Sequence, residues 1–284
     1  GMSYAGKRAL VCFKHVGLNV AADPFVNAGV TGVNGGLIVL VADDPSMHSS
    51  QNEQDSRYYA AFAHVPCLEP SNQQEAYDMM AVGFELSEKV NAPVLMRVTT
   101  RMAHSRAGVT IVDSPKAQNA MSLPKDLRQF VLLPAIARKN YKGLLAMQAA
   151  MEEASDNSKY CALELRKQGG VGIVTTGIAR NYLAEVLGNE PHEYSILKVT
   201  QYPLPRKMVS AIYNHCRELI VMEEGAPFVE ELLRGYMDNG KPIHGRLDGT
   251  LPRDGELNPN LVAKAIGRDI PEGEAIPSLV AGRP

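Results

Sequence analysis

The stretch HVPCLEPSNQQEAYDMMAVGFELSEKVNAPVLMRVTT, residues 64–100, decides the fold class of this chain. It begins and ends with short apolar runs, a pattern typical of strands that are buried on both faces of a parallel sheet. Between the two runs, apolar residues recur at helical spacing, and Ser71 with Gln74 forms a predicted capping box at the start of a helix. The sequence therefore predicts a β–α–β unit, and its right-handed crossover is typical of a doubly wound sheet.

The same alternation of strand and helix patterns continues on both sides of this unit. Residues 8–13 and 36–42 predict two earlier strands. A second α/β unit is indicated by further apolar runs at residues 171–177, 194–205 and 218–224. We therefore predict an α/β protein with two doubly wound domains, one over residues 1–115 and the other over residues 168–284.

The predicted first domain has few strands. Only four are indicated, whereas open α/β sheets usually have ~5–6. We therefore expect its opening strand and helix to be either absent or supplied from elsewhere. Residues 116–167 are predicted to form a connector, which has prolines in its first half and then a helix-like pattern that continues to Gly169-Gly170.

Composition excludes several classes of protein. The 29 basic and 31 acidic residues are balanced in both halves of the chain, so nucleic acid is not an expected partner. The four cysteines are far apart without a C-x-x-C pair, which argues against a local zinc or iron–sulfur site and favours a reducing cytoplasm. No segment has the ~20 apolar residues that a membrane-spanning helix needs.

Polar residues follow three of the four predicted strands of the first domain, at the edge where open α/β sheets bind ligands. A helix is predicted to start near Asn19 and to offer free N–H groups to an anion. The candidate site residues are Lys14, His15, Gly17 and Asn19 after the first strand, Met47, His48, Ser49, Gln51, Asn52 and Glu53 after the second, and Arg101 with His104 after the fourth. We expect them to converge on one pocket.

The same residues also allow simpler interpretations. Asp44 fits an ordinary turn, His48 a surface histidine, and Lys14 and Arg101 ordinary surface charges. Asp43, Asp44 and His48 together offer ligands to a metal ion, which is the basis for the alternative of a metal-dependent hydrolase. The sequence has no G-x-S-x-G motif, P-loop or G-x-G-x-x-G fingerprint, so other hydrolase and nucleotide-binding functions are not indicated.

Several long motifs resemble one known family. They are KHVGLNVAADP (14–24), TGVNGGLIVLVADDPSMHSSQNEQDSRYYA (31–60), LEPSNQQEAYDM (68–79), APVLMRVTTRMAHSR (92–106), GIVTTGIARNYLAEVLG (172–188) and LIVMEEGAPFVEELL (219–233). They resemble the α subunit of indolepyruvate:ferredoxin oxidoreductase, one of the thiamine-diphosphate-dependent 2-oxoacid:ferredoxin oxidoreductases. The likeness covers nearly the whole chain.

The resemblance implies a fold and a chemistry. It implies an N-terminally incomplete pyrimidine-binding-like domain at residues 1–115 and a transketolase-C-like domain at residues 168–284. It also implies oxidative decarboxylation of indolepyruvate or another aryl pyruvate to an acyl-CoA, with electrons passing to ferredoxin. By the same resemblance, the cofactor-binding residues would be Lys14, His15, Gly17, Asn19, Met47 and Ser49, and the catalytic residues His48, Gln51, Asn52, Glu53 and Arg101.

The resemblance further implies partners. We expect the glutamate that activates the cofactor, the diphosphate- and magnesium-binding domain with its G-D-G…N motif, and the ferredoxin-like segment with its iron–sulfur clusters to lie outside this chain. Thiamine diphosphate would bind in a cleft shared with those segments, and the chain would be inactive without them, a β subunit and ferredoxin. The alternative is a non-catalytic assembly module that retains the fold. In either case we expect a cytoplasmic homo-oligomer that associates through apolar surface, with no membrane contact.

Overall fold

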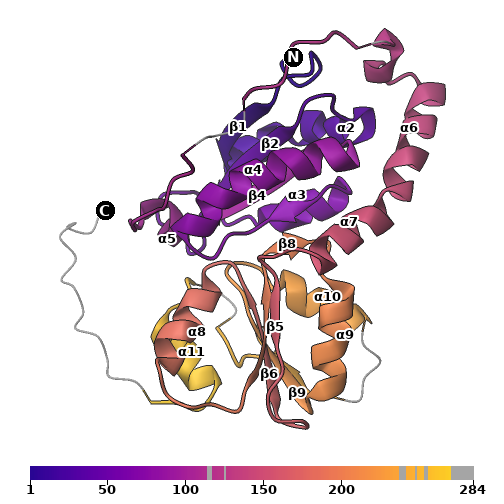
Figure 1. Cartoon of the computed structure of the whole chain (residues 1–284). Helices are drawn as coiled ribbons and strands as arrows, with labels where there is room; N and C mark the ends of the chain where they lie inside the picture. The colour runs from indigo at the N-terminus through magenta and orange to yellow at the C-terminus, as the bar shows by residue number, and fades with distance from the viewer. Residues whose placement is uncertain (114–116, 125, 237–240, 247, 253–254, 270–284) are drawn as a thin grey trace.

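Two five-stranded sheets form the framework of the computed structural model, which describes residues 1–113, 117–124, 126–236, 241–246, 248–252 and 255–269. In spatial order, the first sheet contains β1 (Ala9–Lys14), β2 (Leu37–Asp43), β4 (Val94–Thr99), β3 (Cys67–Leu68) and β8 (Gln201–Tyr202). The second contains β10 (Ile243–His244), β9 (Glu218–Met222), β6 (Val171–Thr176), β7 (Ser195–Val199) and β5 (Ala162–Glu164). Both sheets are mostly parallel and carry helices on their faces (Figure 1), so the predicted fold class is confirmed.

The predicted β–α–β unit is present. Helix α4 (Gln73–Val90) connects β3 to β4, and these strands pair in parallel. The predicted capping box is wrong by one residue, because Asn72 rather than Ser71 has the extended backbone of an N-cap, and its side chain accepts a hydrogen bond from the Glu75 N–H. The Glu75 carboxylate in turn accepts the Ser71 N–H at 2.9 Å.

Four shorter helices complete the first unit. They are α1 (His15–Val20), α2 (Ala22–Thr31), α3 (Ser56–Phe62) and α5 (Thr100–His104). The helix that was predicted to start near Asn19 starts at His15 instead. Because the helix starts at His15, both His15 and Leu18 pack against the interior, and neither has exposed surface.

The predicted connector contains secondary structure of its own. A 3₁₀ helix η1 (Leu127–Phe130), α6 (Pro134–Ala146) and α7 (Gln148–Asp156) follow one another, and α6 packs against α2. The helix-like pattern does not continue to Gly169-Gly170 as predicted, because α7 ends earlier and β5 follows, paired antiparallel with β7. Two of the three residues of β5 are exposed, so its sequence has no buried face from which a strand could be recognised.

The second unit has three layers. Helices α8 (Ala179–Leu187) and α11 (Pro259–Ala265) cover one face of its sheet, and α9 (Arg206–His215) and α10 (Phe228–Tyr236) cover the other (Figure 1). Strands β6, β7 and β9 are therefore buried on both faces, which explains the continuous apolar runs by which they were predicted. No helix in the described ranges is long and apolar enough to cross a bilayer.

The two units share a sheet and a core. The predicted strand at residues 194–205 is divided into β7, which stays in the second sheet, and β8, which pairs antiparallel with β3 of the first. The Glu69 N–H donates to the Thr200 carbonyl at 2.8 Å beside this pairing. One cluster of buried apolar side chains also continues from β2 and β4 to α9 and α10. The carboxyl ends of the strands in the two units consequently lie against each other.

Candidate functional site

A buried charge cluster occupies the contact between the two units. It consists of Asp43, Asp55, Arg57, Glu69, Arg97 and Glu223, none of which is more than 7% exposed. Arg97 Nε lies 2.6 Å from an Asp43 oxygen. Arg57 Nη1 lies 2.8 Å from a Glu223 oxygen of the second unit. Both guanidinium groups also donate to the Glu224 carbonyl, each at 3.0 Å, so the cluster joins the strand ends of the two sheets.

The cluster has more acidic than basic groups, with four carboxyls around two guanidinium groups. Burial raises the pKa of Asp43 and of Glu223, so these two carboxyls hold their protons more strongly than in water. Burial would also raise the pKa of Asp55, but the charges of Arg57 and Arg97 outweigh it and hold that pKa at about 2. The sequence prediction did not include this cluster.

The loops after β1 and β2 contact each other, as the sequence predicts. The Lys14 ammonium donates to the Ser49 hydroxyl at 3.0 Å and to the Ser49 carbonyl at 3.3 Å. The ring of His15, which is fully buried, has its Nε2 3.1 Å from the Asn52 carbonyl, while its Nδ1 has no hydrogen-bond partner in the described part of the chain. These four candidates therefore lie together.

Asp44 organises the loop after β2. Its carboxylate accepts hydrogen bonds from the His48 and Ser49 N–H groups and from the Ser50 and Thr100 hydroxyls. Burial alone would raise the pKa of Asp44, but these hydrogen bonds hold it well below its ordinary value. Asp44 therefore acts as the ionised centre of a turn, in agreement with the simpler interpretation of this residue, and its contacts do not favour the hydrolase alternative.

His48 and Arg101 meet at one acidic residue of the second unit. His48 Nε2 lies 3.2 Å from Glu256 Oε2, and Arg101 binds both Glu256 oxygens, with Nε 2.7 Å from one and Nη2 2.9 Å from the other. About half of each of the His48 and Arg101 side chains is exposed. The loops after β2 and β4 therefore converge at the surface, with a partner that the sequence prediction did not include.

The other candidate site residues lie farther from Glu256. The Glu53 carboxylate turns back to accept the Ser46 N–H at 2.8 Å, and Asn19, Met47 and Gln51 are exposed. Gly17 lies within α1, where its helical backbone makes no demand for glycine. Ser46 and Met47 both have a positive φ, 68° and 55°. Two successive non-glycine residues in this region indicate local strain of the kind that concentrates at functional loops.

Glu224 is a further buried carboxyl that the sequence prediction missed. It is 1% exposed, and neither of its oxygens has a hydrogen-bond partner among the described residues. Burial and the neighbouring charge of Glu256 raise its pKa to about 7. The hydroxyl of Tyr182 is also buried, and burial and the Glu224 charge raise the Tyr182 pKa. The sequence does contain a signal for this carboxyl, because the pair Glu223-Glu224 directly follows an apolar strand.

The chemistry of these side chains suits an anionic ligand more than a metal ion. Lys14, His15, His48 and Arg101 offer an ammonium, two imidazoles and a guanidinium, all hydrogen-bond donors to phosphate or carboxylate groups. Within the described ranges, no group of three or more histidine, cysteine, aspartate or glutamate residues is arranged to hold a metal. The donor groups of these loops therefore suit an anionic ligand.

Comparison with solved structures places the fold in a class. A 2-oxoglutarate:ferredoxin oxidoreductase from Magnetococcus marinus, solved with 2-oxoglutarate, coenzyme A and succinyl-CoA bound, superimposes with a TM-score of 0.68 at 15% identity, over 93% of this chain and 54% of its own. A split-gene transketolase, an inactive β4 tetramer, superimposes with a TM-score of 0.51 at 14% identity, over 91% and 74%. The fold is therefore the one found in 2-oxoacid:ferredoxin oxidoreductases and transketolases.

Sequence relatives narrow this class. Indolepyruvate oxidoreductase subunit IorA of Methanothermobacter thermautotrophicus is 37% identical over 99% of this chain and 48% of its own length. The IorA subunits of Thermococcus kodakarensis and Methanothermobacter marburgensis are 38% and 40% identical over 94% and 92% of this chain, or 42% and 43% of their own lengths. No protein-family profile matches the chain. The resemblance to the α subunit of indolepyruvate oxidoreductase is thus confirmed, and the chain spans less than half the length of these relatives.

Proposed function

We propose that this chain is the part of a 2-oxoacid:ferredoxin oxidoreductase α subunit that forms one side of its thiamine diphosphate cleft. The reaction would be the oxidative decarboxylation of an aryl pyruvate, such as indolepyruvate, to an acyl-CoA. The observation that carries the proposal is the identity of 37–40% to IorA subunits over nearly the whole chain. The convergence of the loops after β1, β2 and β4 supports it, because ligands of open α/β sheets bind there.

The residues in these loops would act by binding and orientation. Lys14 and His15 would bind anionic or polar groups of the cofactor, and His48 and Arg101 would orient the substrate carboxylate. Thiamine diphosphate would supply the electron sink for the loss of CO₂. The glutamate that activates the cofactor, magnesium and the iron–sulfur clusters would come from further segments, with a β subunit and ferredoxin as partners.

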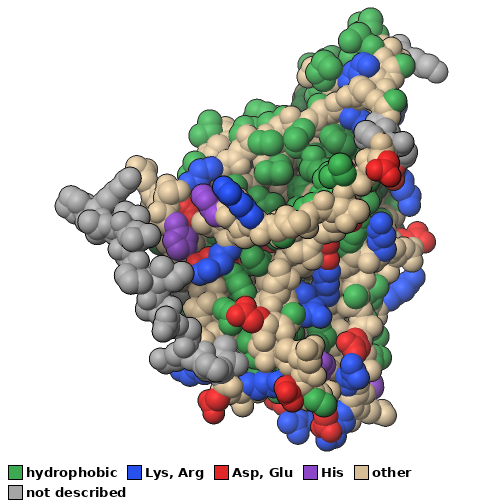
Figure 2. Space-filling view, turned by 60° about the vertical axis from the view of Figure 1, so that its left-hand side comes forward, with side chains coloured by type: hydrophobic (Ala, Val, Ile, Leu, Met, Phe, Trp, Pro, Cys, Tyr) green, Lys and Arg blue, Asp and Glu red, His purple; other side chains and the backbone are tan. Residues whose placement is uncertain are grey.

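An apolar edge of the first unit supports the need for a partner. Strand β1 lies at the end of its sheet, and in the described part of the chain no strand pairs with its outer side. Its residues Leu10 and Val11 are 46% and 38% exposed, and Val16 and Val20 of α1 are 38% and 90% exposed. Figure 2, in which this side of the molecule comes forward, shows hydrophobic side chains gathered over the first unit. A docked segment or subunit would cover this surface.

Complementation tests the proposal directly. The chain would be co-expressed with the remaining part of an IorA subunit and its β subunit, and dye reduction that depends on both indolepyruvate and coenzyme A would be measured. We expect activity only in the complete mixture, and a reduction of at least about tenfold in His48→Ala, because a lost substrate contact to an ionised group has that effect. Assembly of a complex without turnover would overturn the catalytic role and favour the assembly module.

Calorimetry on the isolated chain tests the shared cleft. With thiamine diphosphate and magnesium, we expect weak or undetectable binding, because half of the contacts would be absent. Binding with a dissociation constant of about 1 µM, which corresponds to roughly −8 kcal/mol, would contradict a shared cleft. It would also show that the described residues hold the cofactor on their own.

A further inference from the structure

A cavity lies between the two units, lined by none of the residues of the buried charge cluster. It has a volume of about 440 Å³. Ser71 at the start of α4 lines it from the first unit, Leu163 of β5 with Ile196 and Lys198 of β7 from the second sheet, and Arg180 with Asn181 from α8. The cavity thus lies between one face of the second sheet, helix α8 and the start of α4.

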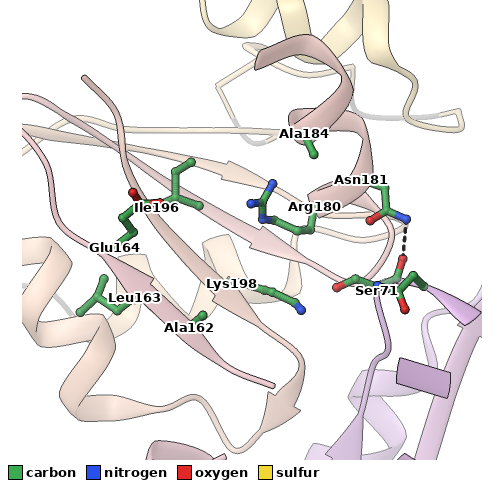
Figure 3. A pocket seen from close by; sticks show the side chains of 10 residues that line it. Ser71, Ala162, Leu163, Glu164, Arg180, Asn181, Ala184, Ile196 and Lys198 are labelled. Carbon is green, nitrogen blue, oxygen red and sulfur yellow. Dashed lines mark hydrogen bonds between the residues drawn. The ribbon is translucent and has the colours of Figure 1, made fainter. Parts of the chain in front are cut away.

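The local geometry brings three of these side chains to one space. Ile196 and Lys198 are two residues apart on a strand and therefore lie on the same face of the sheet. Arg180 projects from the first turn of α8 toward this face, as Figure 3 shows. The Asn181 side-chain amide donates to the Ser71 carbonyl at 2.8 Å, which fixes α8 beside the start of α4.

Arg180 is the unpaired charge of this cavity. No carboxylate or other acceptor contacts its guanidinium within the described ranges. The two carboxylates nearby have their own partners: Glu75 is paired with Lys198, and Glu164 with Arg166. The cavity therefore has an uncompensated positive charge, carried by a planar group that binds phosphate or carboxylate through two parallel hydrogen bonds.

The Ser71 hydroxyl points to the same conclusion. Ser71 is 1% exposed, and its hydroxyl has no hydrogen-bond partner in the described part of the chain, although its backbone N–H and carbonyl are both paired. A buried hydroxyl without a partner is uncommon, because it loses the hydrogen bonds that water provides. An acceptor bound in the cavity would complete its hydrogen bonding once the side chain turned toward it, because the hydroxyl oxygen itself has almost no accessible surface.

We propose that this cavity binds a small organic anion, with its phosphate or carboxylate group on Arg180 and its apolar part against Leu163, Ala184 and Ile196. The volume exceeds that of an inorganic anion and lies within the range of small-molecule sites. The residues are separate from those of the proposed cofactor cleft, so this inference does not depend on the proposed function. Bound at the contact of the two units, such an anion would stabilise their relative position.

Calorimetric titration of the full chain tests the proposal with three probes: phenyl phosphate, benzoate and inorganic phosphate. We expect saturable binding of phenyl phosphate or benzoate, the tighter of the two identifying the anionic group, and weaker binding of inorganic phosphate, which has no apolar part. Arg180→Gln should weaken binding by at least about tenfold, because a charge-assisted pair of hydrogen bonds contributes that much. Arg138→Gln, which changes an exposed arginine on α6, should leave binding unchanged.

Ala184→Leu provides an independent variant, because it fills the cavity without changing a charge, at an exposed helix position that should tolerate leucine. It should abolish binding of the aromatic probes. The proposal is overturned if no probe binds up to about 10 mM, which corresponds to roughly −2.7 kcal/mol, or if Arg180→Gln binds as tightly as the parent chain. Inorganic phosphate binding as tightly as phenyl phosphate would also overturn the apolar part of the site.

Discussion

Arg57 and Arg97 are the residues on which the contact between the units depends most. Each is fully or almost fully buried, and each contacts carboxyl groups from more than one segment of the chain. A buried ion pair adds little net stability compared with apolar packing, but removing one partner leaves charges that are neither paired nor hydrated. Loss of either arginine is therefore more harmful than loss of a surface ion pair.

Arg57→Met should lower the free energy of unfolding by roughly 3–5 kcal/mol, because Asp55 and Glu223 would be left buried with less compensation. Denaturant titration monitored by circular dichroism measures this change. Arg217→Gln, which removes the exposed pair with Glu218, is the matched control and should have a much smaller effect. Equal effects of the two variants would contradict the role assigned to the cluster.

Glu224 should make stability depend on pH near neutrality. Its pKa is about 7 in the fold against an ordinary value of 4.5. A carboxyl with a raised folded pKa contributes stability that is fully present below its unfolded pKa and is lost as pH rises through the folded value. The groups that act on it are Glu256, which raises its pKa, and Arg246 and Arg97, which lower it. The window is therefore from about pH 4.5 to just above pH 7.

Glu224→Gln tests this dependence. The parent chain should lose up to about 3 kcal/mol between roughly pH 5 and pH 8 through this residue, and the variant should not, so the difference between the two free energies of unfolding should change steadily across that range. Denaturant titrations at four pH values provide the measurement, with the exposed Glu185→Gln as control. A difference that is constant with pH would show that Glu224 does not titrate in this range.

At the scale of elements, the parts of the fold that could be predicted are those with a buried face. Strands β6, β7 and β9 have continuous apolar runs, and α4 has a regular apolar spacing, because each packs against a core. Strand β5 was missed, and β8 was not separated from β7, for different reasons. β5 is mostly exposed, and the two residues of β8 belong to an apolar run that gives no sign of leaving one sheet for the other.

The candidate functional site likewise has parts that could be predicted from the sequence and parts that could not. The loops after β1, β2 and β4 could be predicted because polar residues there interrupt apolar runs. The partners from the second unit, Glu223, Glu224 and Glu256, depend on how the two units meet, and a single sequence does not contain that information. Arg97 did leave a signal, since a lone arginine inside the apolar run PVLMRVTT has to find buried carboxylates.

At the scale of elements, the testable prediction concerns the apolar surface of strand β1 and helix α1. The double variant Val11→Lys, Val20→Lys should weaken association of the chain with itself or with a partner subunit by at least about tenfold, because charged side chains on the edge strand and on α1 after it oppose docking. Its free energy of unfolding should stay within roughly 0.5 kcal/mol of the parent value, since both side chains are exposed. Sedimentation velocity over a range of concentrations measures association. Leu165→Lys, next to β5, is the control.

If the double variant associates like the parent chain, the β1 edge is not the docking surface. The expectation of homo-oligomers is tested in the same experiment. A parent chain that sediments as a monomer at all concentrations would contradict that expectation, while binding to a partner subunit would still be open to measurement with the same variants.

For the whole molecule, the shared sheet, the continuous core and the buried charge cluster imply that the two units behave as one body. This rigidity matters for the proposed function, because His48 and Arg101 of the first unit are held by Glu256 of the second. The second unit would then serve to position the loops of the first unit that form the proposed cleft.

Hydrogen exchange on the complemented complex, with and without thiamine diphosphate and magnesium, tests the central claim most directly. The account predicts that the cofactor slows exchange in residues 14–20, 44–55 and 99–105, the three loops after β1, β2 and β4, because bound ligands suppress local opening. Residues 134–156 in α6 and α7 should show no change. Slowed exchange confined to the second unit, or none in the three loops at saturating cofactor, would contradict the account.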